Sequence, residues 1–289
     1  MSRRRLTAAA LGPAALALLL TAGCGSKIPA PEDPPDRYVA LGDSYTSGPG
    51  IPEVVDAPCY RSSNNYPHQV AERLEDTTLV DVSCAGAATN GMTGNQNTGV
   101  SIEEPQLAAV TPDTDLVTIS LGANDSHYFS SVVVGCTLLR PNDPTGAPCR
   151  DQYATDPDYQ LGPVVAEMEA QLELVLGEIR DRAPDARIVF VGYPQIVPAS
   201  GTCDLLPLAA GDYPFVRDAF QRVIDAQQQA AEAAGVDFVD VQALADGHDI
   251  CAAEPWVAGA QNSPGVGSAW HPYLAEQSAV AEAILDLVE

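Results

Sequence analysis

The sequence predicts an α/β fold, a three-layer α/β/α sandwich around a central, mainly parallel sheet. Short apolar runs alternate along the chain with longer segments of helical periodicity, and polar, glycine-containing turns follow the strongest runs. Strands that alternate with helices form parallel sheets with helices on both faces. With 289 residues, of which 46% are hydrophobic, the chain can bury one sizeable core.

Five apolar runs are predicted to be the strands of this sheet. Short apolar runs bounded by turn residues are typical of strands buried on both faces, and they lie at 38–41, 79–82, 116–121, 187–193 and 236–241. Segments with a helical spacing of apolar residues lie between and after them, at 66–74, 161–183, 213–234 and 272–288. No internal repeat or second linker interrupts this order, so we expect one folded domain over residues 37–289.

The N-terminal segment is typical of an export signal. Arg3, Arg4 and Arg5 precede an apolar run at 8–20 that is too short to span a membrane. The run ends in LTAGC at 20–24, which is similar to a bacterial lipobox, in which the cysteine is lipidated and becomes the new N-terminus. We therefore expect a lipoprotein signal peptide at 1–23, and a lipidated Cys24 at the start of a proline-rich tether at 24–36. An ordinary secretory signal is the alternative.

The chain is strongly acidic, with 39 Asp and Glu against 14 Lys and Arg and a formal net charge of −25. Loss of residues 1–23, which contain three arginines and no acid, makes this −28. Such a surface repels phosphate backbones and anionic lipid headgroups. We therefore exclude nucleic acid as a partner and expect membrane attachment to depend on the lipid at Cys24.

Seven cysteines leave one unpaired in any disulfide scheme, and Cys24 accounts for it. An export signal favours disulfides over metal ligation for the other six, which can pair in many ways. No Cys–His spacing indicates zinc, so we expect no metal site. Sequential pairing is the simplest scheme: Cys59–Cys84, Cys136–Cys149 and Cys203–Cys251.

Polar turns follow three of the predicted strands and precede the last predicted helix. The residues that stand out in these turns are Ser44, Gly86, Asn124 and His271. Each alone is more often a turn or cap residue. The carboxyl ends of parallel strands meet at one edge of a sheet, however, and ligands bind at that edge. Together the four residues are therefore a candidate site.

In this order the four residues resemble the four sequence blocks of the SGNH (GDSL-like) hydrolase family, and the first block, VALGDSYTSG at 39–48, is specific. The resemblance extends from residue 38 to the last helix. It implies the flavodoxin-like SGNH hydrolase fold, and is strongest to secreted bacterial lipases and esterases with three sequential disulfides.

The resemblance also implies the roles of the site residues. Ser44 would be the nucleophile and His271 its general base. The backbone N–H groups of Ser44 and Gly86 and the side-chain amide of Asn124 would form the oxyanion hole. Asp43 is expected to anchor the turn through backbone hydrogen bonds rather than to transfer protons.

The sequence departs from the family pattern at Ser268, where the family has an aspartate three residues before the histidine. A Ser-His dyad, in which a backbone carbonyl orients the imidazole, would do without it. The carbonyl of Ser268 is our candidate, its hydroxyl the second choice, and Asp246 or Asp249 the third. Since a carbonyl has no full charge, we expect a less basic histidine than in a triad.

The resemblance therefore implies an extracytoplasmic serine esterase or lipase, secreted or held at the cell membrane. It would hydrolyse lipid or acyl esters as a monomer, without a cofactor. Tyr45, Phe129 and Tyr193 are candidates for an acyl pocket, which the loops 94–106, 194–211 and 136–149 are expected to shape. The alternatives are a carbohydrate or small-molecule deacetylase on the same scaffold and a catalytically inactive binding protein of the cell envelope.

Overall fold

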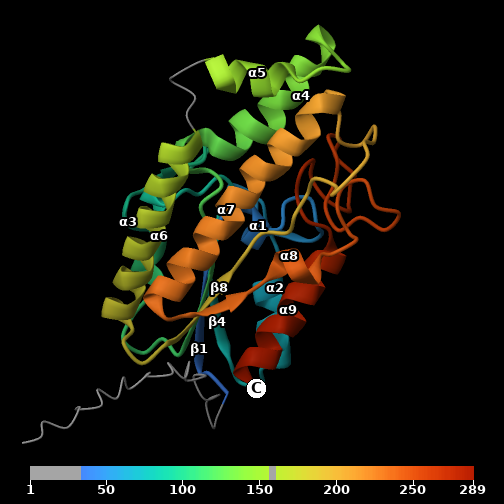
Figure 1. Cartoon of the computed structure of the whole chain (residues 1–289). Coiled ribbons are helices and arrows are strands. Elements are labelled where there is room, and N and C mark those ends of the chain that lie inside the picture. Colours follow the sequence, from blue (N-terminus) through green and yellow to red (C-terminus); the bar gives the residue numbers. More distant parts are fainter. Residues whose placement is uncertain (1–33, 156–160) are drawn as a thin grey trace, which may run out of the picture. The chain divides into compact units, whose positions relative to one another are not determined.

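The computed structural model describes residues 34–155 and 161–289. At its centre, five parallel strands form one sheet in the order β4-β1-β7-β8-β9 (Figure 1). Tyr38 of β1, for example, lies opposite Leu79 of β4 and Leu116 of β7. The predicted α/β class and all five predicted strands are confirmed, with the bounds β1 Arg37–Gly42, β4 Thr78–Asp81, β7 Leu116–Ser120, β8 Arg187–Val191 and β9 Asp237–Val239.

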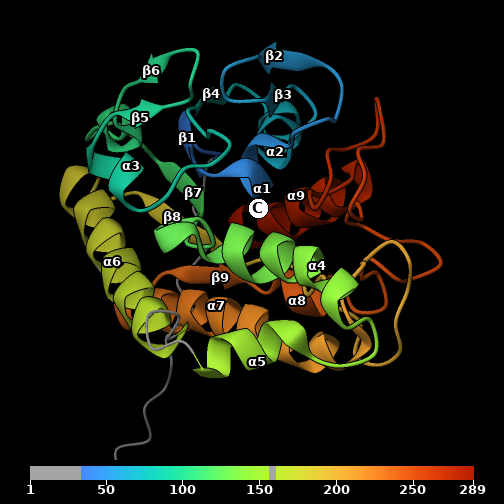
Figure 2. The same ribbon diagram turned by 90° about the horizontal axis from the view of Figure 1, so that it is seen from above.

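Helices cover both faces of the sheet, as a three-layer fold requires. Helices α6 and α7 pack together on one face, and α2 and α9 on the other (Figures 1 and 2). These four helices match the predicted segments: α2 Tyr66–Arg73, α6 Leu161–Arg182, α7 Tyr213–Ala234 and α9 Leu274–Val288. Helix α2 begins at Tyr66, because the Asn65 side chain accepts the His68 N–H and Pro67 occupies the first turn.

Several short elements have no clear periodicity in the sequence. They are the helices α1 Ser44–Ser47, α3 Asn90–Thr93, α4 Gly135–Leu139, α5 Pro148–Thr155 and α8 Val241–Leu244. The short elements also include two small hairpins, β2 Val54–Asp56 with β3 Arg61–Ser62 and β5 Gln96–Asn97 with β6 Ile102–Glu103. Seen along the direction of Figure 2, both hairpins and α4 surround α1.

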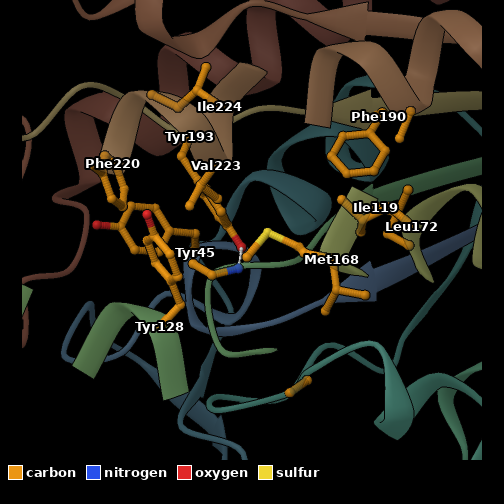
Figure 3. Close-up of a cluster of buried hydrophobic side chains, with 14 of the residues drawn as sticks. Tyr45, Ile119, Tyr128, Met168, Leu172, Phe190, Tyr193, Phe220, Val223 and Ile224 are labelled. Atoms are coloured by element: carbon orange, nitrogen blue, oxygen red, sulfur yellow. Dashed lines mark hydrogen bonds between the residues drawn. The ribbon is translucent and has the colours of Figure 1, made fainter. Parts of the chain in front are cut away.

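The central strands are apolar throughout because each of their faces lies against a separate core. In β1, Val39 and Leu41 belong to the larger core under α6 and α7, whereas Tyr38 and Ala40 belong to the core under α2 and α9. Successive side chains of a strand point to opposite faces, so a strand with helices on both sides reads as a continuous apolar run. Figure 3 shows part of the larger core, where Met168 and Leu172 of α6 lie near Ile119 of β7.

The strand order creates a crevice at the carboxyl edge of the sheet. Strand β1 lies between β4 and β7, so the chain leaves β1 toward one side and later returns to its other side. Ligands bind at such a topological switch point, outside the carboxyl ends of the strands. The segments that follow β1, β4 and β7 meet there, and they contain Ser44, Gly86 and Asn124.

The six cysteines of the domain pair sequentially, as Cys59–Cys84, Cys136–Cys149 and Cys203–Cys251. The first of these bridges ties the β2–β3 hairpin to the segment after β4. Residues 1–33, which include the predicted signal peptide, Cys24 and most of the tether, lie outside the described residues. In the parts of the chain that the structure describes, no helix has the length and hydrophobicity of a membrane span.

A buried glutamate should make the stability of the fold depend on pH. Glu276, in the first turn of α9, is 2% exposed, and its carboxylate accepts a hydrogen bond from Gln277 Nε2 at 2.7 Å. Burial raises the pKa of Glu276 to about 8, from 4.5 in an exposed glutamate. Between those two pH values the folded protein holds a proton that the unfolded chain releases, so the free energy of unfolding falls as the pH rises.

We expect the variant Glu276→Gln to gain stability over the wild type as the pH rises from 5 to 8.5, by roughly 3–5 kcal/mol at the upper end. Urea unfolding at both pH values measures the difference. Glu232→Gln, an exposed change near the end of α7, is the matched control and should show no such trend. A stability difference between Glu276→Gln and wild type that stays constant across this range would contradict the prediction.

Candidate active site

The turn after β1 presents Ser44 at the crevice. Gly42 ends the strand with φ +144°, and a Cβ at this position would lie 2.6 Å from the carbonyl oxygen of Ser120. Only glycine fits such a close approach of two strands. Ser44 then starts the short helix α1 and is 8% exposed. Its hydroxyl and its N–H make no hydrogen bond within the described residues, so both are available to a substrate.

Asp43 anchors this turn. Its carboxylate is 1% exposed and accepts hydrogen bonds from the Tyr45 N–H at 2.8 Å and from the Tyr193 hydroxyl at 2.5 Å. Burial raises the pKa of Asp43 to about 7, and these two hydrogen bonds oppose that rise. Tyr193 was a candidate for the acyl pocket, but it is fully buried against Tyr45 and Phe220, with its hydroxyl occupied by Asp43 and by the Ala123 N–H (Figure 3).

The segments after β4 and β7 bring Gly86 and Asn124 beside Ser44. Gly86 has φ +80°, a conformation that favours glycine, and its N–H has no partner within the described residues. Asn124 Nδ2 donates to the Ala87 carbonyl at 3.0 Å and lies 3.4 Å from Asp43 Oδ2. The amide has two N–H groups: the bond to Ala87 holds one, and only the long contact to Asp43 competes for the other. Two backbone N–H groups and one side-chain amide therefore converge on the same crevice.

His271 lies just before α9, and its ring is held by a carbonyl group. Nδ1 of the ring is 2.7 Å from the carbonyl oxygen of Ala269. A carbonyl can only accept, so Nδ1 carries the proton and Nε2 presents a lone pair. The ring is half-buried, and burial lowers the pKa of His271 below its usual 6.5, against a smaller opposite effect of the Ala269 hydrogen bond.

The expectation that Ser268 orients the histidine is wrong. Its carbonyl accepts the backbone N–H of His271 at 3.1 Å, and its own N–H donates to the Pro49 carbonyl. Trp270, the residue before His271, has φ +68°. This left-handed conformation turns the chain so that the Ala269 carbonyl faces the ring of His271, two residues later. No carboxylate among the described residues is hydrogen-bonded to the ring. Asp249, an alternative partner, accepts the Cys251 N–H instead.

A side-chain hydrogen bond, beside the backbone bond from Ser268 to Pro49, ties the histidine turn to the serine turn. The hydroxyl of Tyr45, the residue after Ser44, donates to the Trp270 carbonyl at 2.9 Å, and the Tyr45 ring lies 5.9 Å from the His271 ring. The two residues of the proposed dyad are 227 positions apart in the sequence, and this contact joins their immediate neighbours.

One pocket of about 560 Å³ collects the candidate residues. Ser44, Gly86, Asn124, Ser268 and His271 all line it. Its other walls include the apolar and aromatic side chains of Tyr45, Tyr60, Phe129, Val134 and Trp270. Two of the three aromatic candidates, Tyr45 and Phe129, therefore line the pocket. The loops 94–106, 194–211 and 136–149, which were expected to shape it, supply none of its lining residues.

Three buried glutamines support the site, and no sequence pattern singles them out. Gln106 makes two hydrogen bonds to the backbone of Gly42, at 2.8 and 2.9 Å. Gln227 donates to the carbonyl of Leu121, and Gln277 donates to that of Tyr45. Each amide fixes a backbone group within three residues of Ser44 or Asn124. Their partners are far away in sequence, so no local motif identifies them.

Two of the other three histidines have ring contacts away from the pocket. The His248 ring stacks on Trp256, and His68 Nδ1 lies 2.7 Å from Asn65 Oδ1. Within residues 34–155 and 161–289, no three His, Cys, Asp or Glu side chains are grouped as metal ligands would be.

Comparison with known proteins assigns the same region of the chain to one family. The model of the GDSL-like lipase/acylhydrolase family matches residues 40–274. Lipase 2 of Streptomyces coelicolor is 41% identical over 260 residues, which are 87% of this chain and 85% of that protein. The crystal structure of phospholipase A1 from Streptomyces albidoflavus superposes with a TM-score of 0.71 at 26% identity, and covers 88% of this chain and 99% of its own.

A second solved structure, the extracellular lipase of Streptomyces rimosus, has a TM-score of 0.69 at 27% identity, over 88% of this chain and 99% of that one. The family match includes the turns that contain Ser44, Gly86, Asn124 and His271. It also includes every strand of the central sheet except the first residues of β1. The chain therefore belongs to the GDSL-like lipase/acylhydrolase family of ester hydrolases.

Proposed function

We propose that this protein is an extracytoplasmic, lipid-anchored serine esterase that hydrolyses carboxylic esters through an acyl-enzyme on Ser44. The observation that supports it best is the pocket itself. A free serine hydroxyl, a histidine with a fixed tautomer and three hydrogen-bond donors open onto one cavity with apolar walls. These are the parts that acyl transfer needs: a nucleophile, its base and a site for the oxyanion.

The reaction would begin with transfer of the Ser44 proton to Nε2 of His271 as the serine oxygen attacks the ester carbonyl carbon. The N–H groups of Ser44 and Gly86 and the amide of Asn124 would bind the carbonyl oxygen as it becomes negative. The imidazolium of His271 would then protonate the leaving alcohol. A water activated by the same ring would hydrolyse the acyl-enzyme and release the acid.

The oxygen that orients His271 belongs to a carbonyl, not to a carboxylate. The Ala269 carbonyl fixes the tautomer but stabilises the imidazolium with a dipole rather than with a full charge. Burial lowers the pKa of His271 as well, since it disfavours the charged ring. His271 would therefore be neutral, and ready to accept a proton, across the neutral pH range.

The walls of the pocket favour an ester with an apolar acyl group. Tyr45, Tyr60, Phe129 and Trp270 line the cavity together with Val134, and its volume of about 560 Å³ is large for an acetyl group alone. Lipid or acyl esters are therefore the proposed substrates, and no cofactor takes part. Deacetylation of carbohydrates or small molecules is the second candidate. A series of esters of increasing chain length, run beside an acetylated polysaccharide, separates the two.

The proposed location follows from the N-terminal sequence and the disulfides. The export signal at 1–23 and the lipobox around Cys24 support a lipoprotein whose catalytic domain spans residues 37–289. We take this domain to be a monomer. Three disulfides fit an oxidising compartment. Metabolic labelling with palmitate should mark the wild type but not Cys24→Ala, which should be released from the membrane. Equal labelling of both would reject the anchor.

A fluorophosphonate probe tests the catalytic proposal directly. We expect it to modify Ser44 and no other residue, because only a serine with an adjacent base and an oxyanion site attacks the phosphorus quickly. Mass spectrometry of the labelled peptide locates the adduct, and hydrolysis of p-nitrophenyl esters should be lost in step with labelling. Heat-unfolded protein is the control. An unlabelled Ser44 in the folded protein would instead support the inactive binding protein.

A further inference from the structure

The loop that contains Gly86 is fixed at almost every backbone position. The Cys84 N–H donates to the Gly42 carbonyl, the Ala85 N–H to the Cys59 carbonyl and the Ala87 N–H to the Cys84 carbonyl. The Cys59–Cys84 disulfide holds the same segment covalently. Of the four N–H groups from 84 to 87, that of Gly86 alone has no partner within the described residues. The N–H that a substrate oxyanion needs is thus the one left free.

One side chain determines how the peptide group before Gly86 is oriented. Gln96, in the β5–β6 hairpin, donates from Nε2 to the carbonyl of Ala85 at 2.9 Å. No other hydrogen bond to this carbonyl is present in the described part of the chain. The Ala85 carbonyl and the Gly86 N–H belong to one planar, trans peptide group, so they point in opposite directions. A donor that holds the carbonyl on one side therefore holds the N–H on the other.

The freedom of Gly86 makes such a restraint necessary. With φ +80° and no side chain, Gly86 could rotate its peptide group at little cost, and the space around it is open. The closest heavy atom to a Cβ at this position would be Gln96 Nε2, at 3.9 Å. Gly86 lines the pocket together with Ser44, whereas Gln96 does not.

We propose that Gln96 is a positioning residue for the oxyanion hole, whose amide fixes the Ala85–Gly86 peptide so that the Gly86 N–H faces Ser44. The inference rests on the acyl-enzyme mechanism proposed above. A donor that is aimed in advance stabilises the transition state without having to reorient during the reaction. Loss of Gln96 should therefore slow the chemical step and leave ground-state binding, which depends on the pocket walls, nearly unchanged.

The test compares Gln96→Leu, which keeps the size of the side chain but removes the donor, with the wild type. We expect kcat for a p-nitrophenyl ester to fall about 10- to 100-fold, with KM changed by less than about twofold. A trifluoromethyl ketone, which forms an oxyanion on Ser44, should bind more weakly by the same factor as kcat falls. Gln229→Leu is the matched control, because Gln229 also donates to a backbone carbonyl, that of Asp225, but on the exposed face of α7.

A second variant keeps the proposal testable if Gln96→Leu disturbs the hairpin. In Gln96→Glu the ionised side chain cannot donate, whereas its protonated form can. The ratio of its kcat to that of the wild type at the same pH should therefore rise as the pH falls through the carboxyl pKa. A merely structural role would not produce this recovery.

Two results would overturn the inference: a kcat within about threefold of the wild type for folded Gln96→Leu, or a ketone affinity that stays the same while kcat falls. The inference would also be overturned if the ratio of the Gln96→Glu kcat to the wild-type kcat did not change with pH. Failure of the proposed function itself looks different, because the wild-type protein would then hydrolyse no ester and Ser44 would not be labelled.

Discussion

Replacing His271 by alanine is expected to lower kcat for p-nitrophenyl ester hydrolysis by about 10⁴-fold or more, because Ser44 then has no base within reach. KM should change little, since the apolar walls of the pocket remain. The fold should also remain, because the ring of His271 makes one hydrogen bond, to Ala269, among the described residues. Steady-state kinetics and thermal unfolding of the purified variant measure the two effects.

The control for this change is the double variant Ser44→Ala/His271→Ala. Residues that act as one unit are not additive, so the double variant should be no slower than either single one. His248→Ala removes a different ring, which is stacked on Trp256, and should leave kcat within about threefold of the wild type. If His271→Ala kept more than a tenth of the activity, another group would have to be the base and the proposed dyad would be wrong.

Asn124→Ala should lower kcat by about 10²–10³-fold, the usual cost of removing one oxyanion donor. Ala87 and Asp43 orient the amide of Asn124, at 3.0 and 3.4 Å from Nδ2, so its position is set before a substrate binds. The effect should therefore appear in kcat, with a smaller change in KM. Kinetics with esters of one acyl chain and different alcohols measure it, and the loss should be similar for all of them, since every substrate forms the same oxyanion.

Asn90→Ala is the matched control for this prediction. Asn90 is an exposed residue of α3 outside the lining of the pocket, and its loss should leave kcat unchanged. An effect of Asn124→Ala below about tenfold would mean that the amide does not contact the oxyanion. If the fall in kcat, converted to an activation free energy, equalled the loss in the free energy of unfolding, the bonds of Asn124 to Ala87 and Asp43 would have a structural role instead.

Strands and long helices could be predicted because their signal is local. The run at 38–41 is apolar because both faces of β1 are buried, and α7 has the predicted bounds Tyr213–Ala234 because its apolar residues recur at helical spacing. Helices α4 and α5 gave no such signal. They are short, they contact each other, and the Cys136–Cys149 bridge joins them.

The partner of the histidine shows where local reasoning stops. Ser268 was the natural candidate because it occupies the position of the missing acid, but the ring is bonded to the carbonyl of Ala269. That contact depends on the left-handed backbone of Trp270, a conformation that few non-glycine residues adopt. Hydrogen bonds from Trp270 to Ala258 and from Tyr45 to Trp270 hold it in place, and neither partner is near in sequence.

The sequence by itself determined the layers of the fold and the residue types of the site, since periodicity and short motifs are properties of neighbouring residues. It left the pairing of the six cysteines open, and the structure shows it to be sequential. Only the tertiary structure decided which carbonyl orients His271, that Tyr193 is bonded to Asp43, and which glutamines hold the strand-end turns. These contacts join segments that are far apart in the chain. Their geometry depends on backbone positions that exist only after the strands have paired and both cores have formed.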